Sequence, residues 1–352
     1  KKECLRLVKE RKKKKNGTMK EGGTKDRKKE KARPLQEEED KEDCPICCDA
    51  LPRFSYQLRR LMCCGKGLHI KCAKDLKSNT SMTHEQKNTC IMCRATLFVI
   101  GSKEETERLR EWVNKGKVWA MIVLAQRYMH GEGVKQSDKK EIELYEMAAK
   151  RGNATAQCNL GFYYQQGTHG LTQSSKRAIE FYTLAAYQGD AIAQYNLGQC
   201  YRQGTFGVTQ SDKKAIELLE MAAKGGNANA QYNLGCYYEQ GSHGLTQSSK
   251  KAISYYTLAA EQGHSDAQYD LGQYYREGTH GLTQSSKKAI EYYTLAAEQG
   301  HADAQHNLGF MYATGRGVEM SDSRARKWWT KAAAQGNEIA IKGLKWLDEH
   351  GL

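Results

Sequence analysis

A 37-residue repeat constrains the fold of this 352-residue chain more than any other feature. The dipeptide Leu-Gly recurs at this interval from Leu160-Gly161 to Leu308-Gly309, and a tyrosine stands three residues after each glycine. Leu124-Ala125 precedes the series by a 36-residue step. Each tyrosine is followed by a glycine-rich loop and then by an alanine-rich segment that ends in glycine. Two helices per unit at this period predict an α-solenoid, because one unit cannot bury its apolar face alone and six stacked units can.

Residues 190–226 illustrate how one unit is expected to fold. Small residues and the Leu197-Gly198 pair keep the first helix thin on one side, so that a neighbour approaches closely. One residue of Ser211-Asp212 caps the second helix, and one of Gly225-Gly226 supplies its left-handed stop. The packed stripe of the second helix is predicted to be Ala215, Leu218, Leu219, Ala222 and Ala223.

Two further helices are predicted at the ends of the repeats. Residues 101–116 form a short helix in which Ser102 and Glu105 make a capping box, and Gly116 ends it. Its apolar face is Leu109, Trp112 and Val113. A closing helix near the end of the chain packs through Ala340, Leu344, Trp346 and Leu347.

The repeat resembles the Sel1-like repeat family, a relative of tetratricopeptide repeats. The pattern A-x-x-x-L-G-x-x-Y, followed by A-x-x-x-Y/L-x-x-A-A-x-x-G, recurs six times with variations over residues 117–352. The resemblance implies a superhelical scaffold that binds proteins on its concave face, without catalysis of its own. The family also includes adaptor subunits of ubiquitin-ligase complexes.

By analogy with tetratricopeptide repeats, the groove is lined by a trio at i, i+4 and i+7 of each first helix, a spacing that places the trio on one stripe. Ordinary polar surface is the alternative interpretation. Tyrosine and arginine are residues that anchor interfaces. The trios are Tyr195, Gln199 and Arg202, then Tyr232, Cys236 and Glu239, then Tyr269, Gln273 and Arg276. Three loop pairs are predicted to be turn residues rather than metal ligands, because they lie on separate loops: His169-Gly170, His243-Gly244 and His280-Gly281.

Eight of the twelve cysteines lie between Cys44 and Cys93. Two Cys-x-x-Cys pairs flank a central Cys/His cluster, which is the spacing of a zinc site rather than of a disulfide framework. This pattern predicts a reducing, intracellular compartment, cytoplasmic or nuclear. In the repeats, Cys158, Cys200 and Cys236 are expected to act as small buried apolar residues.

The cysteine spacing resembles a RING finger, which implies a cross-braced pair of zinc sites. Site one would consist of Cys44, Cys47, His69 and Cys72. Site two would consist of Cys64, Cys90, Cys93 and a fourth ligand. The chain has Lys66 where the family has histidine, so the fourth ligand stays open between Cys63 and His84, or the site is empty. One Zn²⁺ ion is therefore expected at site one, and the sequence leaves the occupancy of site two undecided.

RING ligases hold a ubiquitin-charged conjugating enzyme in a reactive pose, so their catalysis is positioning and needs no nucleophile. The resemblance assigns Ile46 and Leu76 as apolar contacts for that enzyme, and Arg94 as the arginine that bridges enzyme and ubiquitin. The alternative role of Ile46 and Leu76 is packing in the core of the small domain. The alternative for Arg94 is a charge exposed to solvent. Ile91 departs from the family, which has proline there.

The net charge of +14 is uneven. Residues 1–33 hold 16 Lys and Arg against five Asp and Glu, and residues 34–43 hold six acids against one lysine. Too few apolar groups are present to offset chain entropy, so residues 1–43 are predicted to be a disordered tail. Its basic clusters at 11–15 and 25–29 resemble a bipartite nuclear import signal, with weak binding to nucleic acid or acidic lipid as the alternative. No apolar run of 18 residues exists, so no transmembrane helix is expected.

The sequence therefore predicts a mostly helical chain in four parts. They are a tail over 1–43, a RING-like zinc domain over 44–100, a linking helix over 101–116 and six Sel1-like repeats with a closing helix over 117–352. The predicted function is a zinc-binding scaffold for protein–protein interaction, acting as a RING-type ubiquitin ligase or a subunit of a ligase complex. The alternatives are a non-catalytic zinc-stabilised adaptor and, more weakly supported, a protein that associates with nucleic acid through its tail.

Overall fold

The computed structural model of the protein describes residues 58–60, 67–69 and 102–351. Strands β1 (Leu58–Arg60) and β2 (Gly67–His69) form an antiparallel pair in which Leu58 lies opposite His69. The predicted tail lies outside the described residues, and so does most of the predicted RING-like domain.

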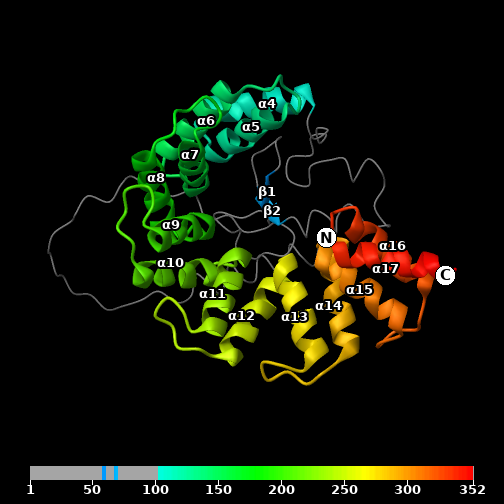
Figure 1. Ribbon diagram of the computed structural model, residues 1–352. Helices are drawn as coiled ribbons and strands as arrows, with labels where there is room; N and C mark the ends of the chain where they lie inside the picture. The colour runs from blue at the N-terminus through cyan, green and yellow to red at the C-terminus, as the bar shows by residue number, and fades with distance from the viewer. Residues whose placement is uncertain (1–57, 61–66, 70–101, 352) are drawn as a thin grey trace, which may run out of the picture. The chain divides into compact units, whose positions relative to one another are not determined.

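The rest of the regular structure in the described residues is helical (Figure 1). This confirms the prediction of a mostly helical chain. The helices are α4 (Lys103–Asn114), α5 (Val118–His130), α6 (Asp138–Lys150), α7 (Ala154–Gln166), α8 (Ser175–Tyr187), α9 (Ala191–Gln203), α10 (Asp212–Lys224), α11 (Ala228–Gln240), α12 (Ser249–Glu261), α13 (Ser265–Glu277), α14 (Ser286–Glu298), α15 (Ala302–Thr314), α16 (Asp322–Ala333) and α17 (Glu338–Glu349).

The chain divides into two compact units, residues 1–156 and 157–352, with the boundary inside α7. In the first unit α4 packs on α5, and α5 packs on α6. Ser102 caps α4 as predicted, because its Oγ accepts a hydrogen bond from the Glu105 N–H at 3.1 Å. The buried Glu105 carboxylate pairs with Arg127 of α5 at 3.0 Å, which ties the two helices together.

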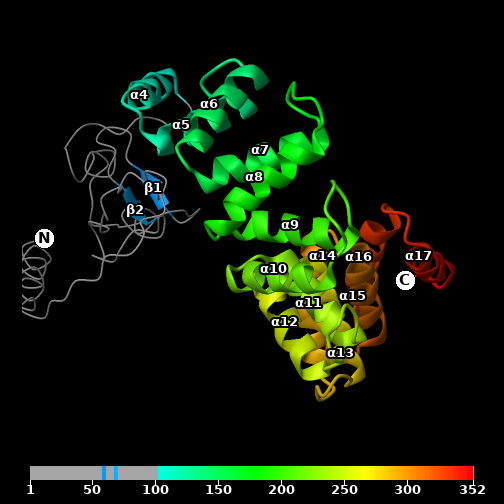
Figure 2. The same cartoon turned by 90° about the vertical axis from the view of Figure 1, so that its left-hand side faces the viewer.

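In the second unit, α8 to α17 follow one another as helical hairpins, and each helix packs on the next one along the chain (Figure 1, Figure 2). The first helices of the repeats here are α9, α11, α13 and α15, and the second helices are α8, α10, α12, α14 and α16. Helix α17 packs on α16 and closes the series within the described residues. This arrangement is the predicted solenoid of helix pairs.

Serine and glycine set the ends of the second helices. Each helix begins after a serine with extended backbone, whose Oγ accepts a hydrogen bond from the N–H three residues later. These serines are Ser174, Ser211, Ser248, Ser285 and Ser321. A glycine with positive φ follows each helix, and for α10 this is Gly226 with φ of +85°. Of the alternatives that the sequence left open, Ser211 is the cap and Gly226 supplies the left-handed stop.

Except at Gly198, the recurring glycine of the first helix lies beneath an aromatic ring of the second helix. A Cβ added at Gly272 would lie 2.6 Å from Cδ1 of Tyr293, and one at Gly235 would lie 2.7 Å from Cε1 of Tyr256. Both tyrosines are fully buried. Only a residue without a Cβ lets the ring approach this closely. Packing between the two helices of a repeat therefore explains the Leu-Gly dipeptide.

A buried glutamine on each first helix joins successive hairpins. Nε2 of Gln268 donates a hydrogen bond to the Ala260 carbonyl at 3.0 Å, and its Oε1 accepts one from Gln299 at 2.7 Å. Gln231 likewise donates a hydrogen bond to the carbonyl of Ala223, but its buried Oε1 has no hydrogen-bond partner among the described residues. These glutamines were not among the residues predicted to be buried, because a glutamine in a helix is usually solvent-exposed.

Two details of the predicted packing differ from the packing in the structure. In α10 Leu218 is only half-buried, and Ile216 is buried in its place. In α17 Ala340 and Leu347 are buried as predicted, but Trp346 is 48% exposed and lies beside the His350 ring. Among the described residues no helix has the length and apolar character to cross a membrane.

Candidate functional site

The predicted groove residues lie on three successive first helices of the second unit, α9, α11 and α13. Every one of them is half-buried, so each reaches the surface and also contacts the protein. We call eight of them the trio surface: Tyr195, Gln199, Arg202, Tyr232, Glu239, Tyr269, Gln273 and Arg276. Cys236 lies in the same stripe of α11.

Histidines at the start of the next first helix hold two tyrosines of the trio surface. The Tyr232 ring stacks on His264 with centroids 4.5 Å apart, and the Tyr269 ring stacks on His301 at 4.6 Å. His264 is also the N-cap of α13, because its Nδ1 accepts a hydrogen bond from the Ala267 N–H at 3.4 Å. Burial lowers the pKa of His264, which favours the neutral ring that this acceptor role requires.

Glu239 joins three parts of the second unit. Its Oε2 accepts a hydrogen bond from the Tyr256 hydroxyl of α12 at 2.7 Å, and its Oε1 accepts one from the Tyr274 hydroxyl of α13 at 2.6 Å. Nε2 of His280, in the loop after α13, lies 2.9 Å from Oε1. Burial, followed by the bond to Glu239, raises the pKa of Tyr274 and keeps its hydroxyl a donor. The Glu239 carboxylate is therefore part of the packing as well as of the surface.

Asp270 is a second carboxylate in this region that the sequence analysis missed. Burial and the nearby charge of Glu239 raise its pKa to about 6, although a hydrogen bond from Tyr232 opposes the shift. A comparison of the repeats could have identified Asp270, because the neighbouring repeats have asparagine at this position, as in Asn233 and Asn307. A carboxylate has thus replaced a neutral amide at one repeat only.

The remaining polar members of the trio surface are held by their neighbours. Nε of Arg202 donates a hydrogen bond to Gln199 at 2.7 Å, and Nε2 of Gln273 donates one to the Tyr269 hydroxyl at 2.8 Å. Arg276 pairs with Glu277 at 2.7 Å. These contacts fix the side chains in place, so a partner that binds them loses less conformational entropy.

The cysteines of the repeats are free thiols. Cys158 and Cys200 are buried as predicted, whereas Cys236 is half-buried. Burial raises the pKa of Cys200 to about 11 and also raises those of the other two. Because the thiolate is the reactive form, these residues are poor nucleophiles and poor metal ligands.

Of the predicted zinc ligands, only His69 falls within the described residues, as the last residue of β2. Zinc binding and the contacts with a conjugating enzyme stay predictions. The other residues of these two groups lie outside the described residues: Cys44, Cys47, Cys63, Cys64, Cys72, Cys90, Cys93, Ile46, Leu76 and Arg94.

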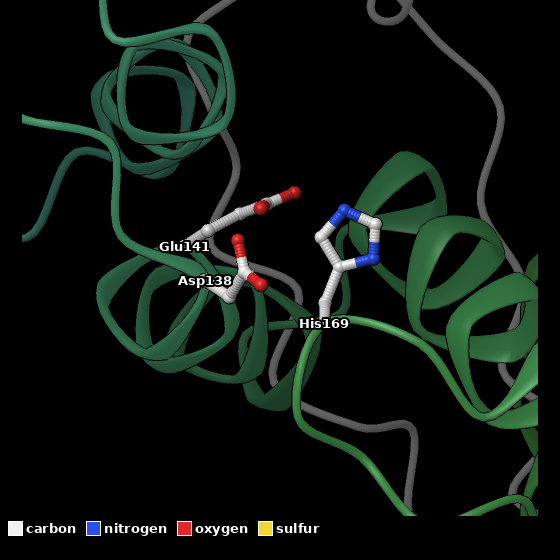
Figure 3. A group of neighbouring side chains, drawn as sticks. All are labelled: Asp138, Glu141 and His169. Atoms are coloured by element: carbon white, nitrogen blue, oxygen red, sulfur yellow. The ribbon is translucent and has the colours of Figure 1, made fainter.

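The histidines of the three His-Gly loops are turn residues, as predicted, since His169, His243 and His280 all have positive φ. His243 Nδ1 lies 3.0 Å from Asp212 Oδ1. Figure 3 draws His169 on the loop after α7, in the second unit, and two acidic residues on α6, in the first unit. Because the three side chains are divided between the two units, we do not count them as one site.

Comparison with known proteins agrees with this architecture. The chain matches the Sel1 repeat family in six successive segments: residues 120–153, 154–190, 191–227, 228–264, 265–301 and 302–337. Among curated proteins no match is found.

Two solved structures are similar to the chain over most of its length. A Sel1 repeat protein from Oxalobacter formigenes is 34% identical, with a TM-score of 0.61 and coverage of 69% of each chain. The protein c5321, a protective antigen of uropathogenic Escherichia coli strains with an SLR fold, is 27% identical with a TM-score of 0.60. That match covers 80% of this chain, which spans only 56% of c5321.

Matched repeats cover well over half of the chain, and in the second unit their hairpins stack into a solenoid that presents polar and aromatic side chains. The repeat region is a scaffold for protein–protein interaction, and the chain belongs to the Sel1 repeat family.

Proposed function

We propose that the chain is a RING-type ubiquitin ligase, or a subunit of such a ligase, whose Sel1 repeats recruit the protein partner. The repeats bind that partner through the trio surface. The cysteine-rich segment binds zinc and holds the conjugating enzyme through Ile46, Leu76 and Arg94.

The observation that carries the recruiting role is the regular series of trios on α9, α11 and α13. Tyrosine and arginine dominate the energetics of protein interfaces, especially where neighbouring side chains already fix them. Here Tyr232 and Tyr269 are stacked on histidines, and Arg202 is bonded to Gln199. The spacing of the eight residues Cys44, Cys47, Cys64, His69, Cys72, Cys90, Cys93 and Arg94 supports the ligase role.

In-vitro autoubiquitination with a panel of conjugating enzymes tests the ligase role. We expect ubiquitin chains with the full protein, and a loss of at least tenfold in Arg94→Ala and in Ile46→Ala while the zinc content is unchanged. A double variant of the trio surface, Arg202→Ala with Arg276→Ala, is the matched control. It should keep autoubiquitination, because those arginines serve the partner and not the enzyme.

A non-catalytic adaptor is the second candidate, favoured by Lys66 and Ile91, which replace the histidine and proline of the RING pattern. In that case zinc only folds the small domain. An absence of ubiquitin chains with every conjugating enzyme, on protein that retains its zinc, would establish the adaptor and exclude the ligase.

A further inference from the structure

Each second helix of the inner repeats carries two adjacent cations in its first turn. The second member of each pair lies over the tyrosine of the same repeat. Arg177 lies 5.1 Å from the Tyr164 ring, and Lys251 lies 4.6 Å from the Tyr238 ring. The pairs Lys214–Tyr201 and Lys288–Tyr275 repeat this contact at 4.8 and 4.6 Å. These cations therefore have a structural partner.

The first cation of each pair has no such structural partner among the described residues. We call these four residues the lysine row: Lys176, Lys213, Lys250 and Lys287. All four are exposed, and none makes a hydrogen bond or ion pair with the described residues. Exposed acids follow one turn later on three of the helices, at Glu180, Glu217 and Glu291, but no ion pair joins them to the row.

The position of the lysine row is unfavourable for the isolated fold. The N-terminal end of a helix carries partial positive charge, so a cation in the first turn is repelled by it. Helices α8, α12 and α14 have no acidic residue in that turn to compensate. The second unit as a whole is balanced, with 18 Lys and Arg against 18 Asp and Glu in residues 157–352. The row is thus a local concentration of positive charge that stability alone does not account for.

The neighbouring tyrosines do not offer a platform for nucleic-acid bases. Tyr238 is covered by Lys251 on one face and stacks on Tyr255 at 5.7 Å with an interplanar angle of 6°. Tyr164 with Phe181 and Tyr275 with Tyr292 repeat this stacking at 5.8 and 5.7 Å. Proteins that bind single strands stack successive bases on open aromatic faces. These rings are occupied within the protein, so the row supplies charge without base stacking.

The four lysines lie on successive second helices, and each of these helices packs on the first helices beside it. A partner that contacts the whole row must therefore cross several helices. An extended polypeptide advances about 3.3 Å per residue, so an extended segment can span the row with few residues. Carboxylates spread along that segment meet lysines on successive helices, whereas a compact block of carboxylates does not.

We propose that the lysine row is a second interaction surface, which binds an extended acidic segment of a partner protein. The segment lies across the first turns of α8, α10, α12 and α14, with its carboxylates on the four lysines. Charge attraction relieves the repulsion between each lysine and its helix end. This inference names a partner class for a surface other than the trio surface, and it does not depend on the ligase proposal.

Fluorescence anisotropy with the entire 352-residue chain tests the proposal. The probe is a fluorescein-labelled peptide of repeated Glu-Ser-Gly triplets, compared with a peptide of the same composition whose glutamates form one block. The test variant changes Lys176, Lys213, Lys250 and Lys287 to Gln. A matched control makes the same charge change at exposed lysines elsewhere: Lys224, Lys327, Lys342 and Lys345.

We expect the test variant to lose at least tenfold in affinity and the control to stay within twofold of the wild type. The triplet peptide should bind at least threefold more tightly than the block peptide. Carbodiimide crosslinking of the triplet peptide, mapped by mass spectrometry, should reach the lysine row. Equal binding by test and control variants, with crosslinks confined to residues 1–33, would overturn the proposal. Tighter binding of an oligothymidylate of equal charge to the row would also overturn it, in favour of nucleic acid.

Discussion

At the scale of single residues, the glycine of the Leu-Gly dipeptide decides how closely the two helices of a repeat pack. At Gly272 an added Cβ would lie 2.6 Å from the Tyr293 ring, whereas at Gly198 its nearest contact would be Leu218 Cβ at 3.3 Å. The difference arises because α10 has leucines where α14 has a tyrosine. The same motif position therefore carries different steric demands in different repeats.

We predict that Gly272→Ala lowers the free energy of unfolding by about 1–3 kcal/mol, the usual cost of forcing atoms into a packed core. Gly198→Ala is the matched control. There the gain in helix propensity, about 1 kcal/mol, offsets the milder contact, so we expect a change below about 1 kcal/mol. Urea unfolding followed by circular dichroism measures both, and equal costs at the two positions would contradict the steric explanation.

Asp270 leads to a residue-scale prediction that depends on pH. Burial and Glu239 raise its pKa from 3.8 to about 6, so between these values the folded state binds more protons than the unfolded state. Stability is then lost as pH rises through that window. We predict that Asp270→Asn raises the free energy of unfolding by about 1–2 kcal/mol at pH 7.5 and by much less at pH 4. Partial solvation of the site keeps the effect at pH 7.5 below the value that the pKa shift alone would give.

The measurement for Asp270→Asn is urea unfolding at the two pH values, with Glu298→Gln as the control. Glu298 is exposed on α14, and its substitution makes the same change in charge. Asparagine still accepts the hydrogen bond from Tyr232, and neighbouring repeats already have asparagine there. A stabilisation that is equal at both pH values would show that the charge of Asp270 is not responsible.

At the scale of elements, the N-caps of the first helices differ between repeats. Asp190 caps α9, Asn227 caps α11, and His264 caps α13. An imidazole accepts a hydrogen bond only when it is neutral, and its charged form is repelled by the helix N-terminus. Helix α13 therefore has a cap whose strength depends on pH, and α15, which His301 caps, shares this chemistry, whereas α9 and α11 do not.

We predict that His264→Asn makes the protein less sensitive to acid. Burial lowers the pKa of His264, so the unfolded state binds more protons below about pH 6.5 and the wild type loses stability as pH falls. Between pH 7.5 and 5.5 the variant should gain about 0.5–1 kcal/mol relative to the wild type, the value of one cap. His130→Asn, an exposed change on α5, is the control and should show no such trend.

At the scale of the whole molecule, each repeat of the second unit has a core built from its own and adjacent helices. One cluster includes Ala252, Tyr256, Ala259 and Leu271, which come from α12 and α13. The predicted zinc ligands lie between Cys44 and Cys93, before the repeats in the sequence. A solenoid is stabilised by contacts between neighbouring repeats, so its folding should not require the metal.

We predict that chelation of zinc from the entire 352-residue chain leaves the far-ultraviolet circular dichroism of the helices within about a tenth of its starting value. The reason is that each repeat is stabilised by its neighbouring repeats. Zinc content, measured by mass spectrometry before and after chelation, is the control for removal. Loss of a larger part of the helical signal would show that the metal-binding segment supports the repeats.

The sequence by itself determined the helix pairs, their period and most of their ends. These features depend on local physics, since a serine, a glycine with positive φ and an apolar stripe act within a few residues, as at Ser211 and Gly226. The choice of the groove residues came from the analogy with tetratricopeptide repeats, and their role stays a prediction. The small residues around Leu-Gly also predicted the close approach of a neighbouring helix, and the structure identifies that neighbour as the second helix of the same repeat.

Only the tertiary structure decided which polar residues bind one another. The Gln268–Gln299 bond and the three contacts of Glu239 join residues that lie 17 to 41 positions apart, so no local pattern specifies them. The raised pKa of Asp270 likewise comes from burial and from a carboxylate on another helix. Local propensity fixes each helix, whereas electrostatics and hydrogen bonding across the hairpins depend on how the repeats stack.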